Sequence, residues 1–425
     1  MKILIKGGLV IDPANNLNEI MDIFIEGGRI CRVAKNINHQ ADEVINAAGK
    51  MVIPGIIDMH VHLREPGRED KETVASGTKA GLKGGVTSIL AMPNTQPVMD
   101  KPASIKLLKE IIQKTSQSHV FICGAITRER MGKELTKIST LKKLGVVAIS
   151  DDGASVDAAR LMLAALKEAK RNKMVVISHC EDKSLSGNGV MNLGAISTRL
   201  GLRGISRESE YKRVGRDIAL AKKANASIHI AHVSCQESVE LIAEAKKRKV
   251  KVTAETCPHY FTFTEEALLD YNTNFKINPP LRGKEDLEAI KNALKDGTLD
   301  VIASDHAPHT ESEKDVEFEK AEFGTIGLET LFAASATALV HSGLMDWPDL
   351  IKKFTLNPAR ILGLDKGTLS VGSDADIAII EPCKEWVLKK EDIISRSKNC
   401  AFVGTKFKGW VEYTICAGNI AYYAK

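Results

Sequence analysis

Apolar and polar positions along the chain separate a helix-rich middle from two strand-rich ends. In the middle, short runs of β-branched and apolar residues alternate with segments such as Leu287, Ile290 and Leu294, whose apolar side chains recur at helical spacing. The first pattern is typical of buried strands and the second of amphipathic helices. The runs predict eight strands, at about 52–58, 86–91, 119–125, 146–150, 174–178, 227–231, 250–254 and 300–304.

Eight strand–helix alternations over roughly 300 residues favour a (β/α)8 (TIM) barrel within the α/β class. An open, doubly wound sheet with a similar number of strands is the alternative. A barrel carries its catalytic groups at the carboxyl ends of its strands. The residues that directly follow the eight runs are therefore the first candidates for a functional site.

Both ends of the chain show a pattern of strands and turns. Short runs such as Ile3–Ile5 and Ile377–Ile380 alternate there with glycine-containing turns. Neither end has enough alternating apolar residues to form a stable sheet by itself. We therefore expect residues 1–50 and 367–425 to pair into one small composite β-sandwich domain, with residues 51–366 forming the barrel.

The composition is that of an ordinary globular protein, with 44% apolar residues and a formal net charge of +5 over 425 residues. Basic and acidic residues are interleaved, and the absence of a basic stripe with aromatic residues argues against a nucleic-acid partner. The sequence shows neither a secretory signal nor a run that could span a bilayer. Its eight cysteines are scattered without a C-x-x-C pair. Together these features predict a cytoplasmic protein without a membrane partner.

Histidines and carboxylates follow several of the predicted strands. His60 and His62 end the first strand, where positions i and i+2 point to the same side and can share one ion. A lone H-x-H pair also occurs on solvated strands, so the later strands carry more weight. These strands end in His179, His232, Asp305 and the pair Asp151–Asp152. Four histidines and at least two carboxylates at one barrel mouth are a ligand set that zinc or a similar divalent ion favours.

These residues and their surroundings resemble the amidohydrolase superfamily over nearly the whole chain. The similarity runs from PGIID at 54–58 to GSDADI at 372–377. Four finer motifs are similar to those of the long, bacterial type of dihydroorotase: HVHLREPG at 60–67, MPNT at 92–95, NPPLR at 278–282 and SDHAPH at 304–309. The first and third motifs are shared with allantoinases and therefore discriminate less.

The resemblance implies a role for each residue of the expected site. One zinc ion would be bound by His60, His62 and Asp305, a second by His179 and His232, and Asp152 would bridge the two. The substrate carboxylate would be held by His62, Arg64, Asn94 and His309, while Asn278 and the backbone at Phe323 and Gly324 would contact the ring.

The reaction that the resemblance implies is the reversible closure of N-carbamoyl-L-aspartate to dihydroorotate with loss of water, the third step of de novo pyrimidine (UMP) biosynthesis. In the hydrolytic direction Asp305 would take the proton of the attacking water and pass it to the departing ring nitrogen. A carboxylate beside the metals lies within reach of both atoms.

The residues themselves agree with a substrate that carries carboxylates. Arg64 lies two positions beyond His62, and its planar guanidinium suits bidentate carboxylate binding. The alternative for Arg64 is a surface salt bridge, and the alternative for Asn94 is turn formation in a proline-containing loop. For His306 and Cys257 we expect packing at strand ends.

The end of the fourth strand departs from the wider superfamily. Many relatives bridge their metals there with a carboxylated lysine, whereas residues 146–152 contain no lysine. Asp151 and Asp152 would point to opposite sides of the strand, and the resemblance selects Asp152 for the metals. An aspartate bridge matches the bacterial dihydroorotases and counts against the alternative functions of allantoinase or hydantoinase.

A catalytically silent subunit that scaffolds aspartate transcarbamoylase is an alternative from another class. The full set of metal ligands argues against a silent chain but leaves open a complex between an active chain and the transcarbamoylase. We expect a homo-oligomer. The charged segment 310–322, directly after His309, predicts a solvated loop, with a substrate-covering lid as the alternative.

Overall fold

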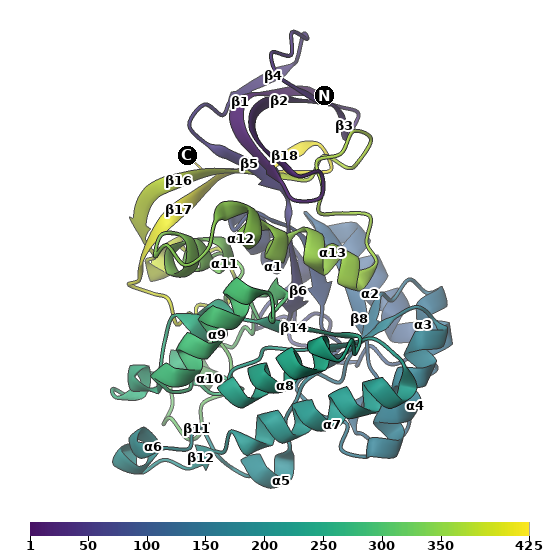
Figure 1. The fold of residues 1–425 in the computed structure, drawn as a ribbon, viewed down its shortest axis with the longest axis vertical. Helices are drawn as coiled ribbons and strands as arrows, with labels where there is room; N and C mark the ends of the chain where they lie inside the picture. Colours follow the sequence, from purple (N-terminus) through teal and green to yellow (C-terminus); the bar gives the residue numbers. More distant parts are fainter. Residues whose placement is uncertain (425) are drawn as a thin grey trace.

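The central element of the structure, a computed structural model that describes residues 1–424, is a barrel of eight parallel strands surrounded by helices (Figure 1). The strand order is β15-β14-β13-β10-β9-β8-β7-β6, so neighbours in the sheet are successive barrel strands in the chain. A parallel bridge between Val61 and His306 joins the last strand to the first. The predicted (β/α)8 barrel is therefore confirmed.

The barrel strands follow the predicted runs closely. They are β6 (Ile56–Val61), β7 (Val86–Ala91), β8 (His119–Gly124), β9 (Ala148–Ile149), β10 (Val175–Ser178), β13 (Ile228–Ile230), β14 (Val252–Thr256) and β15 (Val301–Ile302). The helices are α1 (Val74–Lys83), α2 (Pro102–Thr115), α3 (Ile138–Lys143), α4 (Ala159–Arg171), α5 (Lys183–Ser186), α6 (Ala195–Leu200), α7 (Glu208–Ala224), α8 (Gln236–Lys247), α9 (Lys284–Asp296), α10 (Glu311–Lys314), α11 (Leu331–Ser335), α12 (Trp347–Phe354) and α13 (Leu356–Leu362). A short pair, β11 (Met191–Asn192) and β12 (Gly204–Ile205), lies between β10 and β13 in the chain.

Side chains of the barrel strands alternate between two apolar layers. In β7, Ile89 and Ala91 belong to the layer between strands and helices, whereas Leu90 belongs to the cluster that fills the barrel interior. Successive residues of a strand point to opposite faces, so a strand buried on both faces needs apolar residues at nearly every position. This requirement explains why the barrel strands appear in the sequence as continuous apolar runs.

The two chain ends share a second sheet. Its strands are β1 (Lys2–Asp12), β2 (Leu17–Glu26), β3 (Arg29–Ala34), β4 (Glu43–Asn46), β5 (Met51–Pro54), β16 (Ile377–Val387), β17 (Lys406–Cys416) and β18 (Asn419–Tyr423). Antiparallel pairing of β5 with β16 joins the amino-terminal strands to the carboxyl-terminal ones. Both termini lie at this end of the molecule, whereas α10 and the β11–β12 pair lie at the opposite end (Figure 1).

Gly55 separates this sheet from the barrel. The single strand predicted over 52–58 is divided, because β5 pairs with β16 whereas β6 pairs with β7 in the barrel. A Cβ at Gly55 would lie 2.1 Å from Oγ1 of Thr87, so only glycine lets the chain pass between the two sheets here. We propose Gly55, rather than residue 50, as the boundary between the β-rich domain and the barrel.

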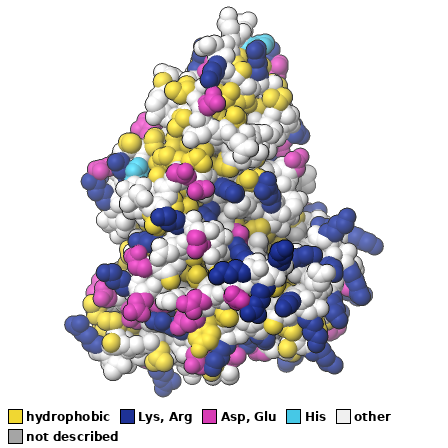
Figure 2. Space-filling model, viewed as in Figure 1, with side chains coloured by type: hydrophobic (Ala, Val, Ile, Leu, Met, Phe, Trp, Pro, Cys, Tyr) yellow, Lys and Arg dark blue, Asp and Glu magenta, His cyan; other side chains and the backbone are white. Residues whose placement is uncertain are grey.

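The face of the molecule seen in Figure 2 carries side chains of both charge signs. Lys and Arg side chains gather over α3, α4 and α7, and Asp and Glu gather over α8 and α9 (Figure 2). Basic pairs such as Lys170–Arg171 and Lys222–Lys223 end α4 and α7, where a cation complements the negative end of the helix dipole. Within residues 1–424 no helix is both long and apolar enough to cross a membrane.

Candidate active site

Four histidines and two aspartates meet at the carboxyl end of the barrel. They come from five strand ends: His60 and His62 from β6, Asp152 after β9, His179 after β10, His232 after β13 and Asp305 after β15. All six side chains are buried. Each apolar run ends where its strand reaches the mouth, and the polar residue that follows it points into the site.

Asp152 lies at the centre of the histidines. Its Oδ1 is 3.2 Å from Nδ1 of His179 and 3.3 Å from Nε2 of His232. On the other side Nε2 of His60 is 3.5 Å from the same oxygen, and Nε2 of His62 is 3.5 Å from Oδ2. One carboxylate thus faces both histidine pairs, as a bridging ligand must.

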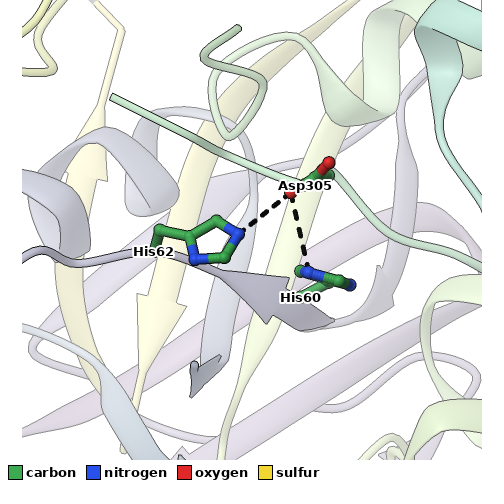
Figure 3. A group of neighbouring side chains, drawn as sticks. All are labelled: His60, His62 and Asp305. Carbon is green, nitrogen blue, oxygen red and sulfur yellow. Dashed lines mark hydrogen bonds and ion pairs between the residues drawn. The ribbon is translucent and has the colours of Figure 1, made fainter. Parts of the chain in front are cut away.

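Asp305 faces the first histidine pair alone. Its Oδ1 is 3.1 Å from Nε2 of His62 and 3.6 Å from Nε2 of His60, and both imidazole rings turn toward this carboxylate (Figure 3). The ligand atoms of His60, His62 and Asp305 form one group within 4.8 Å, and those of His60, Asp152 and His232 form another. The two groups share His60, so they adjoin each other.

The hydrogen bonds of these rings indicate that a cation belongs among them. The side-chain oxygen Oδ1 of Asn94 accepts from Nδ1 of His62 at 2.9 Å. In the neutral ring this bond leaves Nε2 of His62 without a hydrogen. Burial lowers the pKa of His62 and favours that neutral ring. Nε2 of His60 is buried without a hydrogen-bond partner. These two ring nitrogens, which face Asp152 and Asp305, fit a divalent metal.

The second histidine pair leads to the same conclusion. Nδ1 of His179 and Nε2 of His232 lie 2.8 Å apart and both face Asp152. Burial opposes ionisation of Asp152, but the positive potential at His60 and hydrogen bonds from His179 and His232 hold the pKa of this carboxyl well below its usual value. Asp152 is therefore ionised, which is the form that binds metal.

Two glutamates that the sequence did not single out orient these histidines. Oε1 of Glu255, on β14, lies 2.6 Å from Nδ1 of His60, and Oε2 of Glu181 lies 3.2 Å from Nε2 of His179. A carboxylate on the second ring nitrogen fixes the tautomer of a metal-binding histidine. An acidic residue inside the buried strand β14 was the available signal for Glu255, and the H-x-E spacing was the signal for Glu181.

Asp151 faces away from the histidines. Its Oδ1 accepts from the backbone N–H groups of Ile126 (2.8 Å) and Thr127 (3.0 Å), and its Oδ2 accepts from the Thr127 hydroxyl. The two consecutive aspartates thus point to opposite sides, and Asp151 holds the neighbouring loop.

His306 is also a structural residue: its Nδ1 accepts from the N–H of Gly327, and its Nε2 lies 3.2 Å from Glu72.

A cavity of about 330 Å³ opens above the histidines. Its lining includes every residue expected to touch the substrate, namely His62, Arg64, Asn94, Asn278, His309, Phe323 and Gly324. It also includes Asp152, His179, His232 and Asp305. His60 lies beneath the cavity and does not line it. A ligand of this size can therefore contact the metal-binding groups and the polar residues of the rim together.

One corner of the cavity is lined by Arg64 and His309, and Lys71, which pairs with Glu313 at 2.9 Å, contacts the His309 ring. Nη2 of Arg64 is 3.3 Å from Nε2 of His309, and Nζ of Lys71 is 3.2 Å from Nδ1 of the same ring. Burial together with the cations Arg64, Lys71 and Lys314 holds the pKa of His309 far below its usual value. A neutral imidazole between two cations suits an anionic ligand such as a carboxylate. Lys71 belongs to a charged run, 68–72, that resembles an exposed surface, so no local pattern marks it as part of the site.

Most residues of segment 310–322 are exposed, as expected for a solvated loop, but a few buried side chains anchor it. Lys314 and Phe318 are buried. Nζ of Lys276 donates to the carbonyls of Phe318 (2.8 Å) and Glu319 (3.0 Å), and Nζ of Lys314 donates to those of Glu322 (2.7 Å) and Gly324 (3.0 Å). Two buried ammonium groups thus satisfy loop carbonyls that would otherwise need water. The segment is packed against the barrel mouth.

Gly324 and Asn278 close the ring side of the cavity. Gly324 has φ of +144°, and a Cβ there would lie 2.8 Å from Cβ of Ala307, so the position requires glycine. Its N–H donates to the carbonyl of Lys276 at 2.8 Å. Nδ2 of Asn278 donates to Oε2 of Glu181 at 3.2 Å. This wall of the cavity therefore consists of the backbone at Phe323–Gly324 and the Asn278 side chain.

Comparison with known proteins gives consistent family matches. Residues 49–238 match the family model of Dihydro-orotase-like proteins, and residues 241–422 match that of the Amidohydrolase family. A dihydroorotase of Elusimicrobium minutum is 52% identical over 420 residues, covering 99% of this chain and 97% of that protein. One of Pelotomaculum thermopropionicum is 50% identical over 420 residues, covering 99% and 98%.

Solved structures show the same architecture. The L-hydantoinase (dihydropyrimidinase) of Arthrobacter aurescens superposes with a TM-score of 0.89 over 98% of this chain and 95% of its own, at 22% identity. A D-hydantoinase superposes with a TM-score of 0.87 at 26% identity, covering 99% and 95%. The first of these likenesses concerns the fold alone. The barrel and the added β-rich domain are thus common to these enzymes.

Proposed function

Because the chain belongs to the dihydroorotase family of amidohydrolases, we propose that it closes N-carbamoyl-L-aspartate to dihydroorotate with loss of water, and reverses that step. The observation that carries the proposal is the single cavity that joins a metal-ligand set to a cationic corner. A cyclic ureide with one carboxylate needs both features. In the cell this reaction is the third step of de novo pyrimidine biosynthesis.

The metal cofactor of this family is, in our proposal, a pair of zinc ions. His60, His62 and Asp305 would hold one ion, His179 and His232 the other, and Asp152 would lie between them. The geometry of Asp152, within 3.2–3.5 Å of all four histidines, supports this assignment. When bound, such ions lower the pKa of water and polarise a carbonyl group.

The residues of the chain supply orientation and proton transfer. Arg64, Asn94 and His309 hold the ring carboxylate at the cationic corner, and Asn278 and the backbone at Phe323–Gly324 contact the ring. The carboxylate of Asp305 takes a proton from the attacking water and gives it to the departing ring nitrogen. Its oxygen lies at the floor of the cavity, 3.1 Å from His62, where both reacting atoms come within reach.

The expected homo-oligomer and an association with aspartate transcarbamoylase stay part of the proposal. Both rest on the family resemblance, and size-exclusion chromatography with and without the transcarbamoylase of the same organism would test them.

A substrate comparison tests the proposed function directly. The purified zinc-loaded protein is assayed for hydrolysis of dihydroorotate, allantoin and hydantoin. We expect the largest kcat/KM for dihydroorotate, because neither of the other rings carries a carboxylate for Arg64 and His309. Faster hydrolysis of allantoin or hydantoin would contradict the proposal.

A further inference from the structure

Segment 393–401, which we name the mouth segment, lies between β16 and β17 of the β-rich domain yet contacts the barrel mouth. The Ser397 hydroxyl donates to the carbonyl of Lys71 at 2.7 Å, and the N–H of Ala401 donates to the Thr325 hydroxyl at 2.9 Å. Nζ of Lys398 donates to the carbonyl of Ser395 at 2.8 Å within the segment. The carboxyl-terminal part of the chain thus contacts the loops at the barrel mouth.

Asn399 makes the central contacts of the mouth segment. The N–H of His309 donates to its Oδ1 at 3.0 Å. Its Nδ2 donates to the carbonyls of Ala307 (3.0 Å) and Gly324 (3.1 Å). One side-chain amide therefore ties the loop that carries His309 to the loop that carries Gly324.

The backbone of Asn399 is fixed as firmly as its side chain. Its carbonyl accepts from the N–H of Ile326 at 2.9 Å and from the Thr325 hydroxyl at 3.2 Å. The residue is 5% exposed. A buried amide whose donors and acceptor all have partners holds a defined position. It can therefore fix the positions of both loops that it binds.

Asn399 does not touch the substrate cavity. It lines a second cavity of about 650 Å³ on the other side of the loop, together with His309, which lines both cavities. Any effect of Asn399 on the substrate must therefore act through His309 and Gly324.

On the basis of the proposed function, we propose that Asn399 is a positioning residue that sets the distance between the carboxylate-binding His309 and the ring-contacting Gly324. Gly324 already approaches Ala307 so closely that a Cβ would lie 2.8 Å from the Ala307 carbonyl. The spacing between the two loops is thus tight; the N–H of Ala307 donates to the carbonyl of Thr325 at 2.9 Å, and the Asn399 side chain contacts both loops beyond this bond. The metal-binding side chains are placed by the barrel strands and do not depend on it.

Loss of the amide would leave two buried carbonyls and one buried N–H without this partner. Such groups carry a large desolvation cost, so the loops would move to reach other donors or water. The displaced His309 and Gly324 would bind the substrate less well, whereas Asp305 and the metal ligands would keep their places. The expected effect falls on KM rather than on kcat.

The test compares Asn399→Ala with Asn357→Ala in the zinc-loaded full-length protein. Asn357, on α13, donates one side-chain bond to the carbonyl of Asp300 at 2.7 Å, beyond the amino end of β15 and far from the mouth. We expect Asn399→Ala to raise KM for dihydroorotate about tenfold with kcat changed by less than about threefold. We expect Asn357→Ala to leave both constants unchanged.

The outcomes separate this inference from the proposed function. An active wild-type protein with unchanged KM in Asn399→Ala, or with a fall in kcat alone, would overturn the positioning role only. A wild-type protein without activity on dihydroorotate would overturn the proposed function and the inference with it. If Asn399→Ala does not fold, Asn399→Asp fills the same volume, keeps an acceptor for the His309 N–H and loses both donors. Failure of both variants to fold would show a structural role and overturn the inference.

Discussion

Asp305 combines two functions in the proposed reaction, metal ligand and proton carrier. Asp305 comes after β15, and its side chain lines the cavity at the mouth instead of packing in the apolar core. Removal of this side chain should therefore leave the fold intact. Burial raises the pKa of Asp305, but the positive potential of His60 outweighs it and holds the pKa below its usual value. The carboxylate is therefore ionised and ready to accept a proton.

We expect Asp305→Ala to abolish turnover in both directions while the protein still folds. General acid–base catalysis alone is worth about 10²–10⁴-fold, and the loss of a metal ligand adds to it. Steady-state assays in both directions, with circular dichroism as the control for folding, check the expectation. Retention of more than about a hundredth of the wild-type kcat would be incompatible with the proposed role.

Arg64 should determine specificity for the carboxylate. We expect Arg64→Met to weaken binding of dihydroorotate by about 1.5–3 kcal/mol, the value of a hydrogen bond to a charged group. Hydrolysis of dihydrouracil, the same ring without the carboxylate, should change much less. Arg171→Met is the matched control, since Arg171 is exposed on α4 and pairs with Glu168 at 3.2 Å. Equal losses on both substrates would show that Arg64 is structural.

Residues with a distinctive chemical pattern could be predicted from the sequence, and residues that act by position could not. The metal-binding candidates each lie at the end of an apolar run. The pattern of predicted strands therefore located them together at the carboxyl end of the barrel. Lys71 and Asn399 have ordinary neighbours in the sequence, and their importance comes from contacts with residues 238 and 90 positions away along the chain. No local pattern encodes such contacts.

At the scale of elements, segment 310–324 is held by two buried lysines as well as by the apolar contacts of Phe318 and Phe323. Burial, reinforced by the charge of Lys276, lowers the pKa of Lys314 to about 7, although Glu322 and Glu313 oppose the shift. Burial also lowers the pKa of Lys276 to about 8. These ammonium groups lose hydration on folding, and their bonds to loop carbonyls offset part of that cost.

The lowered pKa predicts a pH dependence of stability. Between about pH 7 and pH 10.5, the ordinary lysine value, the unfolded chain binds a proton at Lys314 that the folded chain does not. Raising the pH through this window therefore favours the folded state. Below pH 7 Lys314 is charged in both states, and the full cost of burying that charge lowers the free energy of unfolding. Lys314→Met lacks this titration. We expect the free energy of unfolding of the wild-type protein, relative to Lys314→Met, to rise from pH 7 to pH 9.

Urea unfolding at several pH values measures this difference. Lys320→Met is the matched control, because Lys320 lies in the same segment, is exposed and pairs only with Glu317. A difference between the wild-type protein and Lys314→Met that stays constant with pH, or that falls as the pH rises, would contradict the assignment.

Element boundaries could be predicted where apolar residues give way to polar ones. They could not be predicted where one continuous apolar run contributes strands to two different sheets. Residues 51–61 are all buried, so hydropathy alone cannot reveal that Gly55 ends one sheet and begins another. The short elements α5, β11, α6 and β12 were also not predicted. They are stabilised by distant contacts, such as the bond from Arg282 to Asn192 at 2.8 Å.

At the scale of the whole molecule, the β-rich domain both joins the two chain ends and completes the site. The pairing of β5 with β16 joins the two chain ends in one sheet, at the end of the molecule opposite the mouth. The segment between β16 and β17 nevertheless contacts the mouth. The sequence predicted the pairing of the ends, because neither end could form a sheet alone. It did not predict that the second end would contact the loops that line the substrate cavity.

The central claim is that an aspartate-bridged metal site hydrolyses dihydroorotate. The most direct test removes metal with a chelator and then adds zinc in bicarbonate-free buffer, with dihydroorotate hydrolysis measured at each step. We predict that activity is lost on chelation and returns fully with zinc alone, since Asp152 needs no carbon dioxide to bridge the ions. Hydrolysis that persists without metal, or that returns only when bicarbonate is added, would contradict the account.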